Sequence, residues 1–288
     1  MTSELEAKIK LLDDPNDTVY LAVRKSIISE GKEVIPVLEE AWGNLLNPVV
    51  QERIEEIIKT IQFSDVQQEL NQWKLTGSHD LIYGAFIISK YLYADLSWDS
   101  INQKIEKIKN DVWLELNENL TALEKIRLLN HILYEVYGFT HNTTSVTSSQ
   151  AYFINNVLES KKGNTVSLAI LYISIAQRLQ LPVYGVDLPK NLIACYIDQV
   201  SAYEAFGDSI DNMVLFYINP YNKGGVFGRR EIDYFIQQAK LDSQPSFYSP
   251  CTNVKIIERL ITNLILTYEQ LGYTEKANEL STLLKILN

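Results

Sequence analysis

The sequence predicts an α+β fold that is mostly α-helical, and three observations lead to this prediction. Apolar residues recur at helical spacing through most of the chain. After residue 180 come three short apolar segments with the character of strands, at 183–186, 192–197 and 214–218. The last 36 residues form two amphipathic helical segments that meet at Gly272. We therefore expect a small sheet placed among helices.

Composition and charge restrict the class of protein. The 288 residues are 46% hydrophobic and 22% charged, with 12 glycines and 8 prolines, which argues against a disordered or collagen-like chain. The net charge of −10 argues against a nucleic-acid partner and an anionic membrane surface, because both require clustered Lys and Arg. No signal-peptide pattern or apolar run of roughly 20 residues is present, and the two cysteines form no disulfide framework. We therefore expect a cytoplasmic protein.

The first 75 residues predict short helices joined by tight turns. A turn at 14–17 precedes a helix with Asp17 as its N-cap, and Gly31 ends that helix. A third helix opens around Pro36, and the Asn47–Pro48 turn precedes a fourth. This arrangement resembles HEAT-type repeats. The segment holds 8 Lys and Arg against 14 Asp and Glu, which indicates either a solvated acidic face or a binding site for a basic partner.

Residues 76–150 predict further helices and a loop. Residues 80–93 are strongly apolar and indicate a buried central helix, and residues 98–108 continue with helical spacing. Thr121 and Glu124 form a capping-box pattern that opens a helix ending near Gly138. Residues 141–150 are rich in Ser and Thr, and such a long loop is either functional or an inert connection.

From residue 151 onward, helices and strands both occur. Apolar residues between Leu168 and Leu179 lie on one helical face, and Leu181–Pro182 ends that helix before the strand-like segments. Residues 230–239 predict another helix. Gly224, Gly225 and Gly228 lack the Lys and Ser/Thr of a phosphate-binding loop, so we interpret them as a hairpin or loop.

Residues suited to metal binding are few. The histidines are His79, His131 and His141, and only His131 has a carboxylate, that of Glu135, at helical spacing. We therefore expect neither a metal site nor a cofactor.

Cysteine chemistry has little support in the sequence. Cys195 lies inside an apolar run, where a thiol is usually inert, and Cys251 precedes the final hairpin. Neither has a histidine near it in the sequence.

Two segments resemble a known family. Residues 157–191 read VLESKKGNTVSLAILYISIAQRLQLPVYGVDLPKN, and residues 214–228 read VLFYINPYNKGGVFG. They resemble the bacterial transglutaminase-like core family of the SirB-one type. Its members typically carry Gly-x-Pro-Ile-Ser-Leu at a helix start, Arg-Leu-Gly-Leu-Pro at its end, Gly-Val-x-x-Pro-Gly-His in a strand and Asp-Pro-Phe-x-x-Gly at a strand end. A tetratricopeptide-like tail follows, with an Asn–Leu pair that Asn263–Leu264 matches here.

The resemblance covers about residues 110–288 and implies a degenerate transglutaminase-like (papain-like) core with a small antiparallel sheet. The wider superfamily uses a Cys–His–Asp triad with the Cys at a helix N-terminus. The resemblance implies that Thr165, Asn191 and Asn219 occupy the Cys, His and Asp positions. An unassisted hydroxyl is a poor nucleophile, and a carboxamide does not titrate near neutral pH, so no catalytic residue is expected there.

The candidate cleft follows from these positions. It consists of Gly163, Asn164, Thr165, Ser167, Asn191, Asn219 and Tyr221. We expect Thr165 to open a helix that runs to about Leu179, with Asn164 as its cap, and we expect Thr165, Asn191 and Asn219 to converge. The alternative is that Cys195 or Ser167 substitutes as nucleophile from another position.

These inferences give three domains and a preferred function. The expected domains are a HEAT-like region at 1–75, a transglutaminase-like core at 76–250 and a tetratricopeptide-like hairpin at 251–288. The preferred function is a non-catalytic interaction or scaffold module with an unknown protein partner. One alternative is a cysteine-dependent hydrolase or acyltransferase that uses Cys195 or Cys251. Another is a binder of small molecules or peptides in the vestigial cleft, which the 17 tyrosines would suit.

Overall fold

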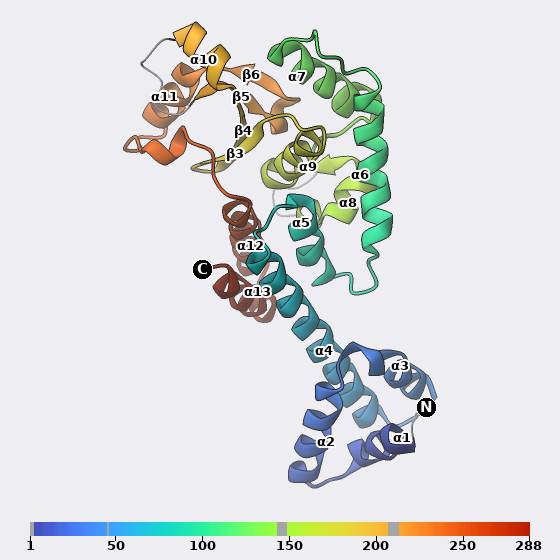
Figure 1. Ribbon diagram of the computed structural model, residues 1–288. Coiled ribbons are helices and arrows are strands. Elements are labelled where there is room, and N and C mark those ends of the chain that lie inside the picture. Colours follow the sequence, from blue (N-terminus) through green and yellow to red (C-terminus); the bar gives the residue numbers. More distant parts are fainter. Residues whose placement is uncertain (1–2, 45, 143–148, 207–212) are drawn as a thin grey trace. The chain divides into compact units, whose positions relative to one another are not determined.

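The chain divides into two structural units, residues 1–72 and 73–288 (Figure 1). The computed structural model describes residues 3–44, 46–142, 149–206 and 213–288. About 68% of the chain is helical and the strands are short, which confirms the mostly helical α+β class. Among the described residues, none of the helices combines the length and the apolar character needed to cross a bilayer.

The first unit is built from short helices around an apolar core. Its elements are α1 (Ser3–Lys10), η1 (Leu11–Asp13), α2 (Asp17–Ser29), η2 (Gly31–Val34), α3 (Ile35–Asn44) and the start of α4 (Pro48–Leu75). The sequence prediction for the α2 cap was wrong by one residue. Asn16 is the N-cap, because its side chain accepts a hydrogen bond from the Thr18 amide, and Asp17 is the first helical residue.

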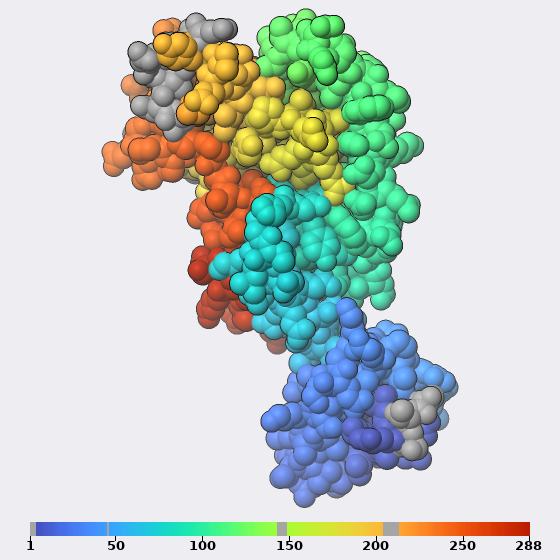
Figure 2. All heavy atoms as spheres, in the orientation of Figure 1, coloured from blue at the N-terminus to red at the C-terminus, as the bar shows by residue number. Residues whose placement is uncertain are grey.

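The second unit contains the remaining helices. They are α5 (Leu81–Lys90), α6 (Trp98–Trp113), α7 (Ala122–Asn130), the π-helix η3 (His131–Val136), η4 (Ser149–Tyr152), α8 (Ile154–Ser160), α9 (Thr165–Arg178), α10 (Gln199–Phe206), η6 (Pro220–Asn222), α11 (Arg229–Gln238), η7 (Pro245–Phe247), α12 (Asn253–Gln270) and α13 (Thr274–Leu287). The predicted capping box of Thr121 and Glu124 and the turn at Gly272 are both confirmed. The α6 helix forms an outer edge of this unit, seen in green in Figure 2.

A four-stranded antiparallel sheet lies in the second unit; three of its strands were predicted from the sequence, and the fourth, a short edge strand, was not. Its strands pair in the order β3 (Val183–Leu188), β4 (Asn191–Ile197), β5 (Val214–Asn219) and β6 (Gly225–Phe227). One face carries Ile193, Cys195 and Tyr217 and packs on Ile232 and Ile236 of α11. The α9 helix packs against the opposite face, so the sheet is enclosed by helices on both sides (Figure 1).

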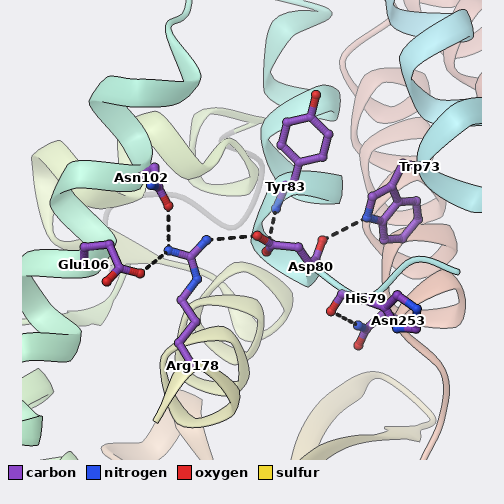
Figure 3. A network of polar contacts seen from close by, with 8 residues as sticks. All are labelled: Trp73, His79, Asp80, Tyr83, Asn102, Glu106, Arg178 and Asn253. Carbon is purple, nitrogen blue, oxygen red and sulfur yellow. Dashed lines mark hydrogen bonds and ion pairs between the residues drawn. The ribbon is translucent and has the colours of Figure 1, made fainter. Parts of the chain in front are cut away.

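The C-terminal end of α9 is fixed by a polar network (Figure 3). Arg178 donates to Asp80 at 2.9 Å, to Glu106 at 2.9 Å and to Asn102 at 2.6 Å. Asp80 is also the N-cap of α5, and its carbonyl accepts a hydrogen bond from the Trp73 indole at 2.9 Å. One guanidinium thereby joins α5, α6 and α9, which sets the axis of the helix that begins at the candidate cleft.

Candidate functional site

The N-terminus of α9 has the geometry predicted from the sequence. Thr165 is its first residue, and the Asn164 side chain accepts hydrogen bonds from the amides of residues 166 and 167 at 3.0 and 2.9 Å. Ser167 accepts from the Asn164 amide at 2.9 Å and donates to the Ala151 carbonyl at 2.7 Å. Ser167 is buried and committed to these bonds, so it is a structural residue. Thr165 is partly exposed, and in the described part of the chain its side chain makes no hydrogen bond.

Asn219 lies at the end of β5 and organises the loop that follows. Its side chain accepts a hydrogen bond from the Asn222 amide at 3.3 Å, and its carbonyl accepts one from the Gly224 amide at 2.9 Å. Asn130 fixes the far side of this loop by donating to the Gly224 carbonyl at 2.8 Å. Tyr172 of α9 in turn donates to Asn130 at 2.8 Å. The Asn219 loop is therefore attached to both α7 and α9.

Asn191 opens β4 and pairs with Leu188 across the hairpin. Strand alternation places Asn191 and Asn219 on the sheet face that carries Cys195 and Tyr217. The two asparagines thus lie at one end of the sheet and on the face that packs on α11, opposite to the face that α9 covers. No hydrogen bond joins the side chain of Thr165 to that of either asparagine. Convergence of all three in one cleft remains a prediction.

His141 lies near the start of α9, a position that the sequence did not predict. It belongs to β1 (Thr140–His141), which pairs in parallel with β2 (Lys162–Gly163), so that His141 is opposite Gly163, two residues before Thr165. Its ring lies 5.1 Å from the ring of Tyr221, centroid to centroid. The long polar segment beginning at His141 was the available sequence signal, but two-residue strands have no periodicity that could have revealed the pairing. Residues 143–148 of that predicted loop lie outside the described residues.

Both cysteines are poorly suited to nucleophilic chemistry. Burial, with a smaller contribution from the nearby Cys251, raises the pKa of the Cys195 thiol to about 12. Burial, followed by the charge of Asp187, raises the pKa of the Cys251 thiol to about 12 as well. A protonated thiol is a weak nucleophile near neutral pH. Both thiols therefore have the character of packing groups.

Two turns, one after the far end of α9 and one between β3 and β4, have a backbone conformation that favours glycine although other residues stand there. Gln180, after the C-cap of α9, has φ 59°, and Lys190, in the β3–β4 turn, has φ 66°. These are the positions where the resembled motifs Arg-Leu-Gly-Leu-Pro and Pro-Gly-His carry Gly. A side chain in the left-handed region costs about 1 kcal/mol. The left-handed conformation of these two residues is therefore imposed by the neighbouring structure and not by the residue type.

The chemistry available at the cleft is hydrogen bonding and ring contact. Thr165 and Asn219 supply neutral donors and acceptors, and Tyr221 and His141 supply aromatic surface. Within the described ranges, no group of three or more His, Cys, Asp or Glu side chains is placed to hold a metal ion.

Comparisons with known proteins agree with this architecture. A family model described as "Transglutaminase-like superfamily" matches residues 99–262. A UPF0162 protein of Pasteurella multocida is 35% identical over 79 residues, covering 27% of this chain and 30% of that protein. Protein SirB1 of Salmonella typhimurium is 27% identical over 110 residues, covering 38% and 41%. F-box only protein 21 of Homo sapiens is 24% identical over 137 residues, covering 48% and 20%.

These matches span less than half of each relative, and no solved structure matches the chain. The HEAT-like and tetratricopeptide-like resemblances of the terminal helices remain predictions. The family match covers more than half of the chain, and it includes α9, the four-stranded sheet and most of α12. The chain therefore belongs to the transglutaminase-like superfamily, in the SirB1-type family.

Proposed function

We propose that this protein is a non-catalytic member of its superfamily that acts in the cytoplasm as a protein-interaction or scaffold module. One observation carries the proposal: Thr165, to which the family resemblance assigns the nucleophile's position, stands first in α9, and its hydroxyl has no base within hydrogen-bonding distance in the described structure. Asn191 and Asn219 carry carboxamides, which cannot alternate between acid and base.

The two thiols support the same proposal. A cysteine-dependent hydrolase or acyltransferase needs an accessible thiolate with a lowered pKa, usually beside an imidazole. Cys195 is fully buried, and burial raises the pKa of both thiols. The enzymatic alternative therefore requires exposure of Cys195, or a lowered pKa for the partly exposed Cys251.

Activity assays test the proposal directly. Wild-type protein is incubated with an amine donor and a glutamine-containing peptide, and separately with amide and ester substrates, at pH 6 to 8. We expect no acyl transfer and no hydrolysis above the rate of buffer. Turnover that survives repurification and disappears in Cys195→Ala or Cys251→Ala would overturn the non-catalytic proposal.

A designed cysteine tests whether the cleft keeps the geometry of its superfamily. Thr165→Cys places a thiol at the α9 N-terminus, where the helix dipole favours the thiolate. We expect faster labelling by iodoacetamide near pH 6 than in the matched variant Thr282→Cys, which is exposed near the C-terminal end of α13. Adding Asn191→His and Asn219→Asp should raise the rate further if the three positions converge. If the labelling rate of the triple variant equals that of Thr165→Cys, the three side chains do not lie together, and the degenerate-triad geometry is refuted.

The cleft as a peptide or small-molecule binding site is a second candidate, and a specific observation favours it. His141 pairs with Gly163, two residues before the partly exposed Thr165, and its ring lies 5.1 Å from the ring of Tyr221. An aromatic pair next to free hydrogen-bonding groups suits a planar amide. Hydrogen exchange with an acetylated, amidated glutamine peptide tests it, with protection of residues 140–142 and 163–166 expected if the cleft binds the amide. Unchanged exchange at saturating peptide would exclude this candidate.

The partner of the proposed scaffold is approached by cross-linking in native extract followed by identification of the linked peptides. Cross-links to another protein that recur at physiological salt and come from the same structural unit each time would support a protein partner. Recovery of the protein as an unlinked monomer in every condition would count against the scaffold proposal.

A further inference from the structure

The turn between α3 and α4 in the first unit exposes large apolar side chains. Trp42 is 41% exposed, Leu46 97% and Val49 51%, and all three lie within eight consecutive positions. Single exposed apolar residues are ordinary on a protein surface, whereas a group of them marks an interaction site. We call these three residues the turn surface.

Hydrogen bonds hold the end of α3 beside the start of α4 at this turn. The Trp42 indole donates to a carboxylate oxygen of Glu55 at 2.9 Å, and the Gln51 side chain donates to the Trp42 carbonyl at 3.1 Å. The inward faces of the same two helices, which include Leu38 and Ile54, are buried in the apolar core of the unit. The turn surface therefore lies on the outer side of the helix pair and does not fill the core.

Carboxylates flank the turn surface on both helices. Glu39 precedes Trp42 by one helical turn, and Glu52 follows Val49 by one helical turn. Both carboxylates are exposed, and within the described residues neither they nor Glu55 form an ion pair. Glu52 and Glu55 are three residues apart on one helix, where like charges repel each other. The helix dipole offsets acidic groups in the first turn, and the first turn of α4 contains none.

The cation next to Glu52 in the sequence is committed elsewhere. Arg53 donates to the carbonyls of Leu12 at 2.6 Å and Asp14 at 3.2 Å, and its guanidinium lies 4.1 Å from the centre of the Tyr20 ring. The first 75 residues as a whole hold 14 Asp and Glu against 8 Lys and Arg. The turn surface thus combines exposed apolar side chains with unpaired negative charge. A complementary partner carries apolar side chains beside Lys or Arg.

We propose that the turn surface binds a basic, amphipathic helix of a partner protein. Such a helix presents apolar side chains and cations next to each other along its length. Its apolar side chains contact Trp42, Leu46 and Val49, and its cations pair with Glu39 and Glu52. The inference rests on the proposed scaffold function, for which it states the chemistry of the partner, and it does not depend on the candidate cleft.

Fluorescence anisotropy with the full chain tests the inference with three labelled peptides. They consist of three repeats of Lys-Leu-Leu-Lys, of Lys-Ser-Ser-Lys and of Glu-Leu-Leu-Glu. We expect saturable one-to-one binding of the first peptide and at least about tenfold weaker binding of the second, which lacks apolar side chains. The third should not bind, because its charge is repelled. The affinity for the first peptide should fall as salt is added, since exposed charges are screened.

Variants assign the binding to the turn surface. Leu46→Ala truncates an almost fully exposed side chain, so it should weaken binding about tenfold while the protein stays folded. Glu52→Gln should weaken binding about threefold at low salt. The matched controls are Leu266→Ala, exposed on α12 of the second unit, and Glu33→Gln, exposed in η2 before the opposite end of α3. Both controls should leave the affinity unchanged.

Three results would overturn the inference. The first is a lack of saturable binding of the Lys-Leu-Leu-Lys peptide at about 1 mM. The second is equal affinity in wild type, Leu46→Ala and Glu52→Gln, which would mean that the peptide is attracted to the acidic chain without a specific site. The third is a dimer in sedimentation experiments that Leu46→Ala dissociates, because the turn surface would then bind a second copy of the chain.

Failure of this inference can be told apart from failure of the proposed function. If the peptide does not bind but recurrent cross-links join the second unit to another protein, the scaffold proposal stands and the turn surface is not its docking site. If the peptide binds at the turn surface and the protein also shows catalytic turnover, the inference stands and the non-catalytic proposal is refuted.

Discussion

The two ends of α9 differ in how their polar groups are satisfied. At the C-terminal end, Arg178 reaches Asp80 and Glu106, residues far away in the sequence, and ties three helices together (Figure 3). At the N-terminal end, the cap is local: Asn164 and Ser167 satisfy each other, and the Thr165 side chain is left without a hydrogen bond in the described structure. Substitution of Arg178 should therefore disturb three helices, while the Thr165 side chain can change with little cost to stability.

Within α9, the C-terminal end is bound to two other helices, and the candidate site lies at the N-terminal end. The superfamily places its nucleophile at the N-terminal end, where a free side chain is required. In this chain Thr165 begins α9, and we propose that it supplies no nucleophile. Mutations at the two ends should accordingly affect different properties, stability at one and reactivity or binding at the other.

The largest effect is expected for the loop that borders the N-terminal end. Gly224 has φ 68°, and an added Cβ would lie 1.9 Å from the Asn130 side-chain oxygen. Gly224→Ala should lower the free energy of unfolding by about 3 kcal/mol, because steric overlap adds to the cost of the left-handed backbone. Urea denaturation measures it. In the control Gly138→Ala, φ is 72° but no atom lies within 4 Å of the added Cβ, so the loss should be only about 1 kcal/mol. Equal losses in the two variants would mean that the Asn130 contact does not fix the loop.

The second-largest effect is expected at Arg178, at the C-terminal end of α9. Arg178→Met removes the cation that Asp80 and Glu106 share and should lower the free energy of unfolding by about 2 kcal/mol. The estimate is moderate because both carboxylates are about 40% exposed and regain water. Thr165→Ala, at the other end, should change stability by less than about 0.5 kcal/mol. Chemical denaturation of both variants measures these losses. A larger loss in Thr165→Ala than in Arg178→Met would contradict the proposed difference between the two ends of α9.

The sheet beneath α9 should make the fold sensitive to alkali. The pKa of Cys195 is raised from its ordinary value of 9.0 to about 12 in the fold. The folded state therefore keeps a proton that the unfolded state loses, so this part of the stability is intact below pH 9 and declines as the pH rises toward 12. At pH 10 the loss should be about 1 kcal/mol relative to pH 8. Tyrosines with raised pKa contribute in the same range, so Cys195→Ala is the control, and its denaturation midpoint should fall less between these pH values. An identical decline in both proteins would exclude the thiol as a cause.

Local patterns in the sequence predicted much of this fold. The capping box at Thr121 and the predicted cap at Asn164 located two helix starts, because a cap and the amides it binds are at most three residues apart. The strands were predicted from apolar runs and the final hairpin from Gly272. The α10 helix and the β1–β2 pair were missed, since a short helix beside a polar segment and two-residue strands carry no periodic signal.

The candidate site was predicted less completely, for a physical reason. Thr165 could be placed because a helix start is a local feature. The contact between His141 and Tyr221 joins residues 80 positions apart, and the anchoring of Gly224 by Asn130 joins residues 94 positions apart. Such contacts depend on how α7, α9 and the sheet pack, and neither residue of a pair indicates its partner in the sequence.

The smallest effect concerns the turn that ends α9. Gln180 adopts φ 59°, and its amide donates to the Gln177 carbonyl at 2.9 Å, so the left-handed backbone closes the helix. Gly has no Cβ to oppose this conformation, but it also has more freedom in the unfolded chain, so Gln180→Gly should raise the free energy of unfolding by about 0.5 to 1 kcal/mol. The control is Gln177→Gly in the last turn of α9, where Gly should destabilise by about 1 to 2 kcal/mol, because a helical position disfavours it and the hydrogen bond from the Gln177 side chain to the Val183 carbonyl is lost. The urea denaturation midpoint should rise in Gln180→Gly and fall in Gln177→Gly. A loss of stability in Gln180→Gly would mean that its side chain holds the turn, and the C-terminal end of α9 would then depend on more than Arg178.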